Sequence, residues 1–280
     1  MPTIRKALPV DFNYVYPLFS GFREPRPTRE MFQRLFEKRW GSDEAHVGYI
    51  IEDQDEAVGY LGTLFSIREI NGRVEKFCNL CTWIVKEEYR SEGLPLLFQV
   101  VRLKNVTITN FTGARVAPIL VKFGFTKLDE TLKIFFALPA FSANCELIYD
   151  QDKIIPYLDA HDRRIVEDHR NFNCGFVLLK SPNGTALLVL KKTTRKNMPL
   201  LEVRYLSGRA VFAKHIQHVL PALCWKMKAI GLMIGDHYLE GLKTPPGLTI
   251  PQRETRLFRS ATVTKTEMDT LYSELQILNI

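Results

Sequence analysis

The chain has 280 residues and a formal net charge of +7; 46% of the residues are hydrophobic and 25% are charged. This composition excludes a disordered, collagen-like or low-complexity chain and predicts a soluble globular protein with two domains or one large domain. The most apolar stretch, 221–235, is interrupted by Lys226 and Lys228, so no run reaches the roughly 18 residues of a membrane-spanning helix. We therefore expect no membrane partner.

The N-terminus, Met-Pro-Thr-Ile-Arg-Lys, has neither the apolar core nor the cleavage site of a signal peptide. The five cysteines are an odd number spread along the chain, which favours reduced thiols over a disulfide framework. Both observations predict a cytoplasmic protein. The positive charge is diffuse and forms no basic stripe with interleaved aromatic residues, so we expect no nucleic-acid partner.

The N-terminal part of the chain begins with a short predicted strand, Ile4–Ala7, and continues with two helices within 11–40 that prolines separate. Thr28 is the expected N-cap of the second helix. Three apolar runs follow, and they predict an antiparallel meander: Val47–Glu52, Ala57–Glu69 and Val74–Val85. Asn71-Gly72 joins the last two runs, and this dipeptide is typical of a tight hairpin turn because both residues tolerate a positive φ.

The hydrophobic period then changes from that of strands to that of helices. Pro95–Lys104 is a predicted helix, Val106–Phe111 a strand, and Ala114–Phe123 a second helix that ends at Gly124. Leu128–Leu138 is the last strand of this half. The first half therefore has the predicted order β-α-α-β-β-β-α-β-α-β.

The second half repeats much of this order. The predicted elements are a helix at Asp159–Arg170, strands at Gly175–Lys180, Ala186–Lys192 and Leu200–Leu206, a helix at Val211–Lys228 and a strand at Ile230–Ile234. Matching elements lie roughly 120–130 residues apart, whereas solenoid repeats have periods of roughly 20–50. We interpret the echo as a duplicated domain; two unrelated α+β pieces are the alternative.

The echo predicts a domain at 1–140 and a second at 141–280 that packs on the first. Residues 244–253 contain three prolines and are a predicted loop. Beyond them, Arg256–Val263 is a predicted strand, and Thr264–Glu267 has the spacing of a capping box before a helix that carries Met268 to Leu275.

One segment, Thr82–Leu96, has the pattern of a site. A strand runs through a polar turn with Gly93 into a helix, and such a junction directs backbone N–H groups and the positive end of the helix dipole at one place. That place suits a phosphate, to which Arg90 would add a charged contact. An ordinary structural turn is the alternative.

These residues, in this order of elements, resemble the GNAT superfamily of acyl-CoA-dependent N-acyltransferases over roughly residues 3–138. In that family a strand enters an Arg/Gln-x-x-Gly-x-Gly/Ala loop; Arg90 and Gly93 match its first two anchors, and Pro95 replaces the last small residue. Val85–Arg90 resembles the family's V-x-P-x-Y-R approach, with Glu87 in place of proline. Gly124-Phe125 resembles the end of a family helix.

The resemblance implies an α/β fold with mixed α+β sheets, in two tandem GNAT-like copies, and a co-substrate, acetyl-CoA or another acyl-CoA. The implied cofactor-binding residues are Thr82, Trp83, Ile84 and Val85 beside the acyl-pantetheine arm and Arg90, Ser91, Glu92, Gly93, Leu94, Pro95 and Leu96 around the pyrophosphate. The implied reaction is direct attack by a small-molecule amine on the thioester, with no metal.

Two departures bear on catalysis. The family often has a tyrosine four residues before Gly124 that protonates the leaving thiolate, and Leu120 stands there. Tyr89 is our candidate for this acid, and water is the alternative. Glu75, at the start of the predicted strand, is our candidate for the base, and a solvated hairpin residue is its alternative interpretation. A non-catalytic GNAT-fold binding or scaffolding module is the alternative function.

Other signals carry less weight. Ser207-Gly208-Arg209 occupies the junction analogous to the phosphate loop, and it predicts a degenerate second copy. Cys78 and Cys81 have redox-motif spacing but lie within a strand, where they face opposite sides. A covalent route through Cys81 needs a histidine that the sequence does not identify. His215 and His218 lie on one helix face without a third ligand, which favours a surface or polar-interface pair over a metal site.

Overall fold

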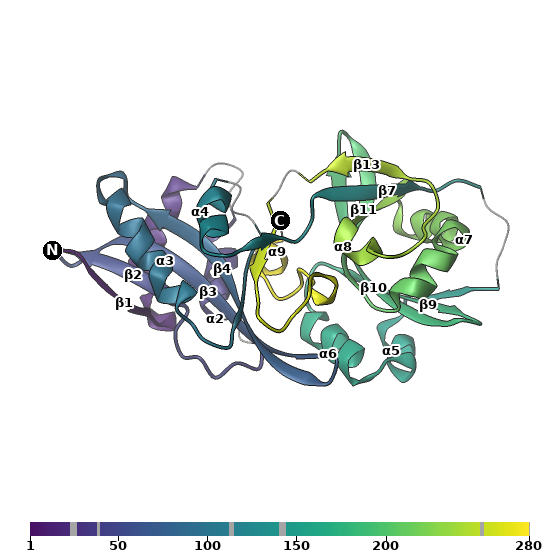
Figure 1. Cartoon of the computed structure of the whole chain (residues 1–280), viewed down its shortest axis with the longest axis horizontal. Coiled ribbons are helices and arrows are strands. Elements are labelled where there is room, and N and C mark those ends of the chain that lie inside the picture. Colours follow the sequence, from purple (N-terminus) through teal and green to yellow (C-terminus); the bar gives the residue numbers. More distant parts are fainter. Residues whose placement is uncertain (23–26, 38–39, 112–114, 140–143, 253–254, 280) are drawn as a thin grey trace. The chain divides into compact units, whose positions relative to one another are not determined.

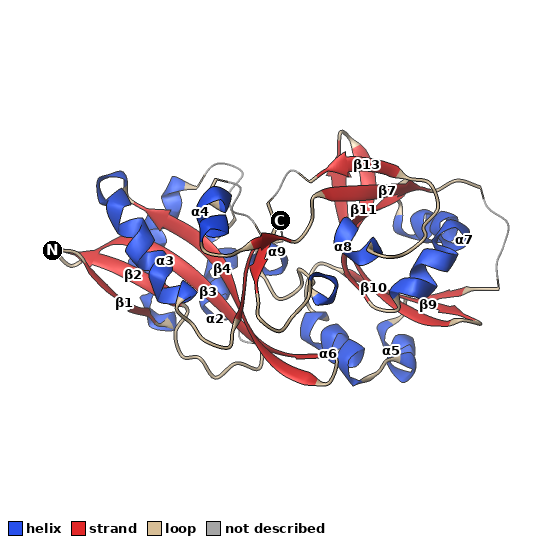
Figure 2. Ribbon diagram, in the orientation of Figure 1, coloured by secondary structure: helices blue, strands red, loops and turns tan. Residues whose placement is uncertain are grey.

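The computed structural model describes residues 1–22, 27–37, 40–111, 115–139, 144–252 and 255–279. The chain forms two compact units. Unit 1 comprises Met1–Lys127, Glu254–Val263 and Tyr272–Ile280, and unit 2 comprises Leu128–Arg253 and Thr264–Leu271. Among the described residues each unit has one mixed sheet of seven strands, accompanied by helices (Figures 1 and 2). The predicted mixed α/β class is confirmed.

The sheet of unit 1 contains the predicted meander. Its strands, in spatial order, are β1 (Thr3–Ala7), β2 (Gly48–Asp53), β3 (Glu56–Ile70), β4 (Arg73–Val85), β5 (Thr107–Asn110), β14 (Leu257–Arg259) and β6 (Thr126–Lys127). Neighbouring strands are antiparallel except β4 and β5, which are parallel. Asn71 and Gly72 join β3 to β4 with φ of 50° and 75°, as the turn requires.

Helices flank both faces of this sheet. They are η1 (Pro9–Asp11), α1 (Phe12–Val15), η2 (Tyr16–Gly21), α2 (Arg29–Glu37), η3 (Glu87–Glu92), α3 (Gly93–Val101), α4 (Ala117–Lys122) and α9 (Glu274–Ile277). Thr28 caps α2 as predicted, because its Oγ1 accepts the Met31 N–H at 3.3 Å. Ala114, the predicted start of the helix that becomes α4, lies outside the described residues.

Two apolar layers hold unit 1 together. On one face, α3 and α4 contribute Leu97 and Leu120 to a core with Leu80 of β4. On the other, aromatic rings of α1, η2 and α2 pack on β3: the ring centroids of Phe19 and Phe36 lie 5.8 and 5.3 Å from that of Tyr60. The sheet is therefore covered on both sides.

The sheet of unit 2 repeats the pattern. Its strands, in spatial order, are β13 (Leu248–Pro251), β7 (Thr131–Phe136), β12 (Gly231–Gly235), β11 (Met198–Leu206), β10 (Gly184–Arg195), β9 (Gly175–Ser181) and β8 (Glu146–Ile148). The helices are α5 (Gln151–Ile154), η4 (Ile155–Tyr157), α6 (Ala160–His169), α7 (Arg209–Met227), α8 (Asp236–Leu239) and η5 (Lys265–Glu267). Here β11 and β12 are the parallel pair.

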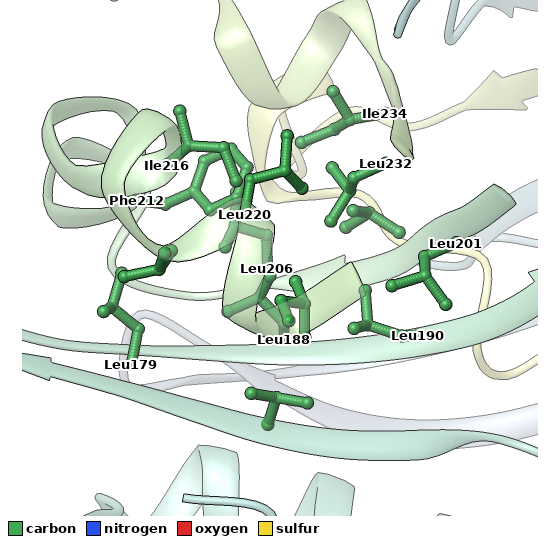
Figure 3. Close-up of a cluster of buried hydrophobic side chains, with 14 of the residues drawn as sticks. Leu179, Leu188, Leu190, Leu201, Leu206, Phe212, Ile216, Leu220, Leu232 and Ile234 are labelled. Atoms are coloured by element: carbon green, nitrogen blue, oxygen red, sulfur yellow. The ribbon is translucent and has the colours of Figure 1, made fainter. Parts of the chain in front are cut away.

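The core of unit 2 lies between α7 and its sheet. Phe212, Ile216 and Leu220 recur at helical spacing on α7 and pack on sheet residues such as Leu188 and Leu201 (Figure 3). The predicted helix Val211–Lys228 is thus confirmed to within two residues at its start and one at its end.

Two strands lie in sheets other than those expected. β7, predicted to end the first sheet, lies between β13 and β12 of unit 2, and β14 lies between β5 and β6 of unit 1. An alternating apolar pattern indicates that a segment is a strand but not which sheet it joins. The units therefore interleave along the chain. The boundary between residues 140 and 141 stays a prediction.

Two further predictions were wrong. The predicted loop 244–253 contains β13, which the prolines obscured; β13 is an edge strand, where proline is tolerated. The predicted helix after Thr264 forms only η5, with its capping box, and the four-residue α9. Met268, Leu271, Tyr272 and Leu275 are all buried, because residues between η5 and α9 run through the interior rather than presenting one helical face to a core.

Candidate active site

The strongest local irregularity of unit 1 is a bulge in β4. The register between β3 and β4 shifts between Tyr60 and Gly62, so that β4 holds an extra residue at 82–83. Thr82 adopts a φ of 45°, which is uncommon for a β-branched residue. A Cβ on Gly62 would lie 2.6 Å from Thr82 Oγ1 and 2.7 Å from Cys81 Sγ, so the glycine makes room for the bulge.

Beyond this point β4 and β5 separate. The two strands pair only where Phe77–Asn79 faces Thr107–Thr109. Leu80–Val85 pairs with β3 on one side, and no strand among the described residues pairs with it on the other. We call this side the open edge of β4. The Lys86 N–H donates to the Val58 carbonyl of β3 at 2.9 Å. Because successive residues of a strand direct their N–H groups to opposite sides, the N–H of Val85 points towards the open edge.

Buried amides line the point where the strands separate. Asn79 Nδ2 donates to Thr109 Oγ1 at 3.0 Å, and Asn79 Oδ1 accepts the backbone N–H of Glu274 at 3.2 Å. Asn110 Nδ2 donates to the Leu80 carbonyl at 3.3 Å. Asn110 Oδ1 is buried and has no hydrogen-bond partner within the described residues. Among the described residues, this buried acceptor is therefore open to a further donor.

A buried thiol and a buried carboxylate lie near the bulge. Cys81 is 3% exposed, and burial raises the pKa of its thiol well above the ordinary value, with the charge of Glu274 adding to the shift. The thiol therefore stays protonated, which argues against the covalent route through Cys81. Glu274 is 2% exposed and lies 195 positions after Asn79, to which it is bonded, so no sequence spacing predicts its presence here.

The structure brings the predicted strand residues to the N-terminus of α3. A Cβ on Gly93 would lie 3.9 Å from the Trp83 ring and 3.9 Å from Val85 Cγ2, so these side chains flank the glycine on one face of the sheet. Ile84 lies on the other face, where its Cδ1 would lie 3.1 Å from a Cβ on Gly21. Thr82 is 9% exposed beside them.

The expected phosphate loop is folded differently. Residues 87–92 form the 3₁₀ turn η3, which runs directly into α3, and Gly93 has helical φ and ψ of −63° and −40°. The Gly93 N–H bonds to the Arg90 carbonyl, and the Tyr89 N–H bonds to the Lys86 carbonyl at 3.0 Å. These N–H groups are therefore engaged within the chain rather than directed at an anion.

The side chains of this turn divide between solvent and core. The guanidinium of Arg90 is 71% exposed and lies 3.3 Å from the carboxylate of Glu87. Ser91 and Leu94 are exposed, Glu92 and Pro95 are half-buried, and Leu96 is fully buried in the core. Leu96 thus serves packing, and Glu87 competes with any anion for Arg90.

The two predicted catalytic residues are not brought together. The Tyr89 hydroxyl donates to Asp53 Oδ2 at 2.8 Å, and this bond raises the pKa of the hydroxyl, which weakens it as an acid. Glu75 lies seven residues before Thr82, so a strand rise of about 3.3 Å per residue separates them by about 23 Å. Glu75 instead accepts the Thr262 hydroxyl at 2.8 Å beside a cavity of about 650 Å³.

A larger cavity, of about 870 Å³, lies at the end of β4. Residues of α1 and η2, the β2–β3 turn, the end of β4 and Arg90 line it, and its charged residues are Asp55, Glu56, Lys86, Glu87 and Arg90. Among the described lining residues, Lys86 pairs with Glu56 at 2.6 Å and Arg90 pairs with Glu87, so that the carboxylate of Asp55 gives this lining an acidic excess. A cavity of this volume holds a small molecule, and its charge suits a cation.

Unit 2 has the same separation of strands but fills it. β11 pairs with β12 only over Leu200–Glu202 and continues to Leu206. The carbonyl of Arg204 on this edge accepts the Thr270 N–H at 3.4 Å and the Tyr238 hydroxyl at 2.9 Å.

The junction after β11 is also engaged. Arg209 donates to the Tyr238 and Glu240 carbonyls at 2.6 and 2.8 Å, and Ser207 Oγ donates to Asp162 Oδ2 at 2.6 Å. These contacts engage the side chains of Ser207 and Arg209 within the chain. They are consistent with the expectation that Ser207-Gly208-Arg209 is a degenerate counterpart of the phosphate loop.

Two other expectations concern membranes and metals. No described helix is both long and apolar enough to cross a membrane. The described residues contain no cluster of three or more histidine, cysteine or acidic side chains suited to a metal ion. Cys78 lies in the core beneath α3, and burial raises the pKa of its thiol, so its spacing from Cys81 reflects strand packing.

No protein-family profile and no curated protein matches the chain. Solved structures do resemble it. A protein from Enterococcus faecalis described as a probable N-acyltransferase aligns with a TM-score of 0.60 and 10% identity over 92% of this chain and 72% of its own. The chain therefore has the GNAT fold.

Two GCN5-related N-acetyltransferases share this GNAT fold. The protein from Anabaena variabilis aligns with a TM-score of 0.58 and 11% identity over 92% of this chain and 72% of its own. That from Kribbella flavida aligns with a TM-score of 0.58 and 12% identity over 92% and 71%. At these identities the likeness concerns the fold, and the chemistry has to be inferred from the side chains of this chain.

Proposed function

We propose that the chain transfers an acyl group from acetyl-CoA, or another acyl thioester with a pantetheine arm, to the amine of a small molecule at the open edge of β4. The bulge at Thr82, which leaves Leu80–Val85 unpaired on one side, carries this proposal. An extended ligand binds such an edge by adding a half-strand.

The groups at the open edge suit an amide-bearing arm. The outward N–H of Val85 is a donor for an amide carbonyl, and the buried Asn110 Oδ1 is an acceptor for an amide N–H. The fit is poorer at the pyrophosphate end, because Glu87 pairs with Arg90 and the N–H groups of η3 are engaged. Affinity for the thioester therefore depends mainly on its arm.

The chemistry requires three tasks of this chain. Backbone N–H groups at the bulge stabilise the oxyanion as the amine nitrogen attacks the thioester carbonyl carbon. A base accepts the amine proton, and we assign this role to the buried carboxylate of Glu274, beside Cys81, because Glu75 lies at the other end of β4. The C–S bond then breaks, and the leaving thiolate is protonated from solvent.

The acidic cavity at the end of β4 is our candidate for the acceptor site. It includes Ile84 and Val85 of the strand that holds the open edge, and Asp55 is the carboxylate of its described lining that pairs with neither Lys86 nor Arg90. A protonated amine is attracted to such a site and loses its proton before attack. We therefore propose a cationic small-molecule amine as the acceptor.

Calorimetric titration with acetyl-CoA tests the thioester site. Val85→Pro removes the N–H at the open edge and leaves the β3 ladder intact, whereas the matched control Val85→Ala keeps the N–H and loses the side chain. Loss of one hydrogen bond predicts about tenfold weaker binding in the proline variant and less in the alanine variant. A wild-type chain that binds no acetyl-CoA and acylates none of a panel of amines would overturn the proposal.

A non-catalytic GNAT-fold binding module is the second candidate. The engaged N–H groups of η3 and the Glu87–Arg90 pair favour it, as does Leu120, which is fully buried in the core. Mass spectrometry separates the two functions. Acylated amine that accumulates over many turnovers supports the enzyme, and thioester binding without product supports the module.

A further inference from the structure

Three polar side chains meet within unit 2. Cys145 precedes β8, Asn183 lies in the turn between β9 and β10, and His215 lies on α7. Cys145 Sγ is 3.3 Å from His215 Nδ1, and His215 Nε2 is 3.0 Å from Asn183 Oδ1. They form a continuous line of thiol, imidazole and amide.

Regular structure fixes each member of this line. β8 pairs with β9 and thereby places Cys145 beside the sheet. The Asn183 N–H donates to Ser181 Oγ at 3.2 Å, and Gly184 follows with a φ of 118°, so the turn has a defined shape. His215 is 9% exposed on a helix whose neighbouring turns enter the core. The strand, the turn and the helix therefore fix the positions of all three residues.

The amide determines where the imidazole carries its proton. Asn183 Oδ1 is an acceptor, so Nε2 of His215 carries the hydrogen and Nδ1 presents its lone pair to the Cys145 thiol. Burial raises the pKa of Cys145 and lowers that of His215, and the positive charge of Lys214 also lowers the latter. At rest the pair is a neutral thiol beside a neutral imidazole, which is poised to act as a general base.

A cavity of about 390 Å³ opens beside the thiol. Leu147, Tyr149, Val219 and Ala222 form most of its wall with Cys145, and His218 and Lys226 complete it. The Lys226 ammonium lies 5.9 Å from the centre of the Tyr149 ring. An apolar wall with a basic group suits a short acyl chain whose carrier is polar or anionic.

We propose that Cys145, His215 and Asn183 form a second reaction centre, in which the Cys145 thiol takes the acyl group of a thioester bound in this cavity. Such an arrangement of nucleophile, base and orienting amide is the pattern of cysteine catalysis. The proposal concerns unit 2 alone and stands whether or not the open edge of β4 transfers acyl groups.

The step balances without an added reagent. His215 Nδ1 accepts the thiol proton as Sγ attacks the carbonyl carbon, and a new S–C bond forms. The C–S bond to the original carrier breaks, and the carrier thiolate takes the proton from His215. The products are an acyl thioester on Cys145 and a free carrier thiol. Asn183 is a positioning residue, because it acts through His215.

The test incubates the full chain with S-acetyl-N-acetylcysteamine, a thioester without a nucleotide, and maps acetylated cysteines by peptide mass spectrometry with hydroxylamine reversal. Cys174 is an internal comparison, because it is also partly buried but its thiol donates to the His169 carbonyl at 3.6 Å. We expect acetyl on Cys145 well before Cys174. His215→Gln should slow acetylation about 100-fold, and His161→Gln, on α6, should not.

The two Asn183 variants distinguish positioning from structure. Asn183→Ala should slow acetylation of Cys145, and Asn183→Asp, which keeps the acceptor, should restore it with the pH profile moved to higher pH. The groups that face His215 are Lys214 and His218 of its own helix, Cys145 and Asn183. Only the side chain at position 183 differs between the two variants.

Three results overturn the proposal. They are equal acetylation of Cys145 and Cys174, a wild-type rate in a folded His215→Gln chain, and identical rates and pH profiles in the two Asn183 variants. Circular dichroism checks that each variant is folded. If His215→Gln is unfolded, the acetylation rates of the two Asn183 variants decide the outcome, because Asn183 is exposed.

Discussion

The two units build the same parallel pair of strands and finish it differently. In unit 2, the carbonyl of Arg204 beyond the paired part of β11 receives protein donors from Tyr238 and Thr270. β4 and β11 both hold a bulge, at 82–83 and at Arg204. In unit 1, however, the edge of β4 has an outward Val85 N–H and an acceptor on Asn110 that no described residue satisfies. Where two parallel strands separate, the exposed backbone edge can therefore be closed by donors of the protein, as in unit 2, or left open to a ligand, as we propose for unit 1.

The junctions that follow these strands differ in the same sense. Arg209 of unit 2 gives its donors to carbonyl groups near α8, whereas Arg90 of unit 1 remains in solvent with Glu87. Gly208 has a φ of 60° in close contact with β10, and Gly93 is an ordinary helical residue. Duplicated architecture therefore does not imply duplicated chemistry.

The largest effect that separates the units is expected at these two glycines. A Cβ at Gly208 would clash with the Thr185 carbonyl oxygen, so Gly208→Ala should lower the free energy of unfolding by about 3 kcal/mol. Gly93→Ala meets only atoms at 3.9 Å and should be neutral or slightly stabilising. Urea unfolding of both variants measures the difference, and equal destabilisation would contradict the comparison.

A smaller effect is expected where unit 2 closes its edge. Tyr238→Phe removes the hydroxyl that donates to the Arg204 carbonyl, and the buried carbonyl keeps only its long bond from Thr270. We expect a loss of about 1 kcal/mol in the free energy of unfolding. Hydrogen exchange should locate the loss at β11 and leave β4 unchanged. Uniform loss of protection in both sheets would argue against an edge specific to unit 2.

The smallest effect is a contrast in pH dependence between two carboxyl groups. In unit 1 the hydrogen bond from Arg5 holds the pKa of Asp11 below its ordinary 3.8, so its stabilisation is present above that pH and is lost as the pH falls through the lowered value. In unit 2 burial raises the pKa of Asp162 above 3.8, so stability declines as the pH rises from 3.8 through the raised value.

The melting temperature as a function of pH tests this contrast. Asp11→Asn should flatten the acid side of the curve, and Asp162→Asn should remove the decline above pH 3.8. Parallel curves for the wild-type chain and both variants would show that neither carboxyl group is coupled to folding.

Local sequence predicted the local structure. The Asn71-Gly72 turn, the N-cap at Thr28 and the capping box at Thr264 all hold, because each depends on a few adjacent residues. The exchange of β7 and β14 between sheets was not predictable, since a strand's alternation carries no information about its partner.

The candidate site was predictable only in part. Val85 lies in the predicted strand, but no residue pattern indicates the bulge at Thr82, which depends on the shared register with β3. The predicted strand contains Glu75, but this residue lies at the end of β4 that is remote from the bulge. Glu274 and the Cys145–His215 contact join residues 195 and 70 positions apart, beyond the reach of any local motif.

The strand β14 has a consequence for how the chain is made. β5 is one of the inner strands of its sheet, and its neighbour Leu257–Arg259 is translated long after Thr107–Asn110. Until then the emerging first half presents a strand that is buried in the finished fold but has an unsatisfied edge, which is a hazard for association with other chains. The first sheet can therefore be completed only after nearly the whole chain has been translated. A fragment ending at residue 140 should aggregate rather than fold alone.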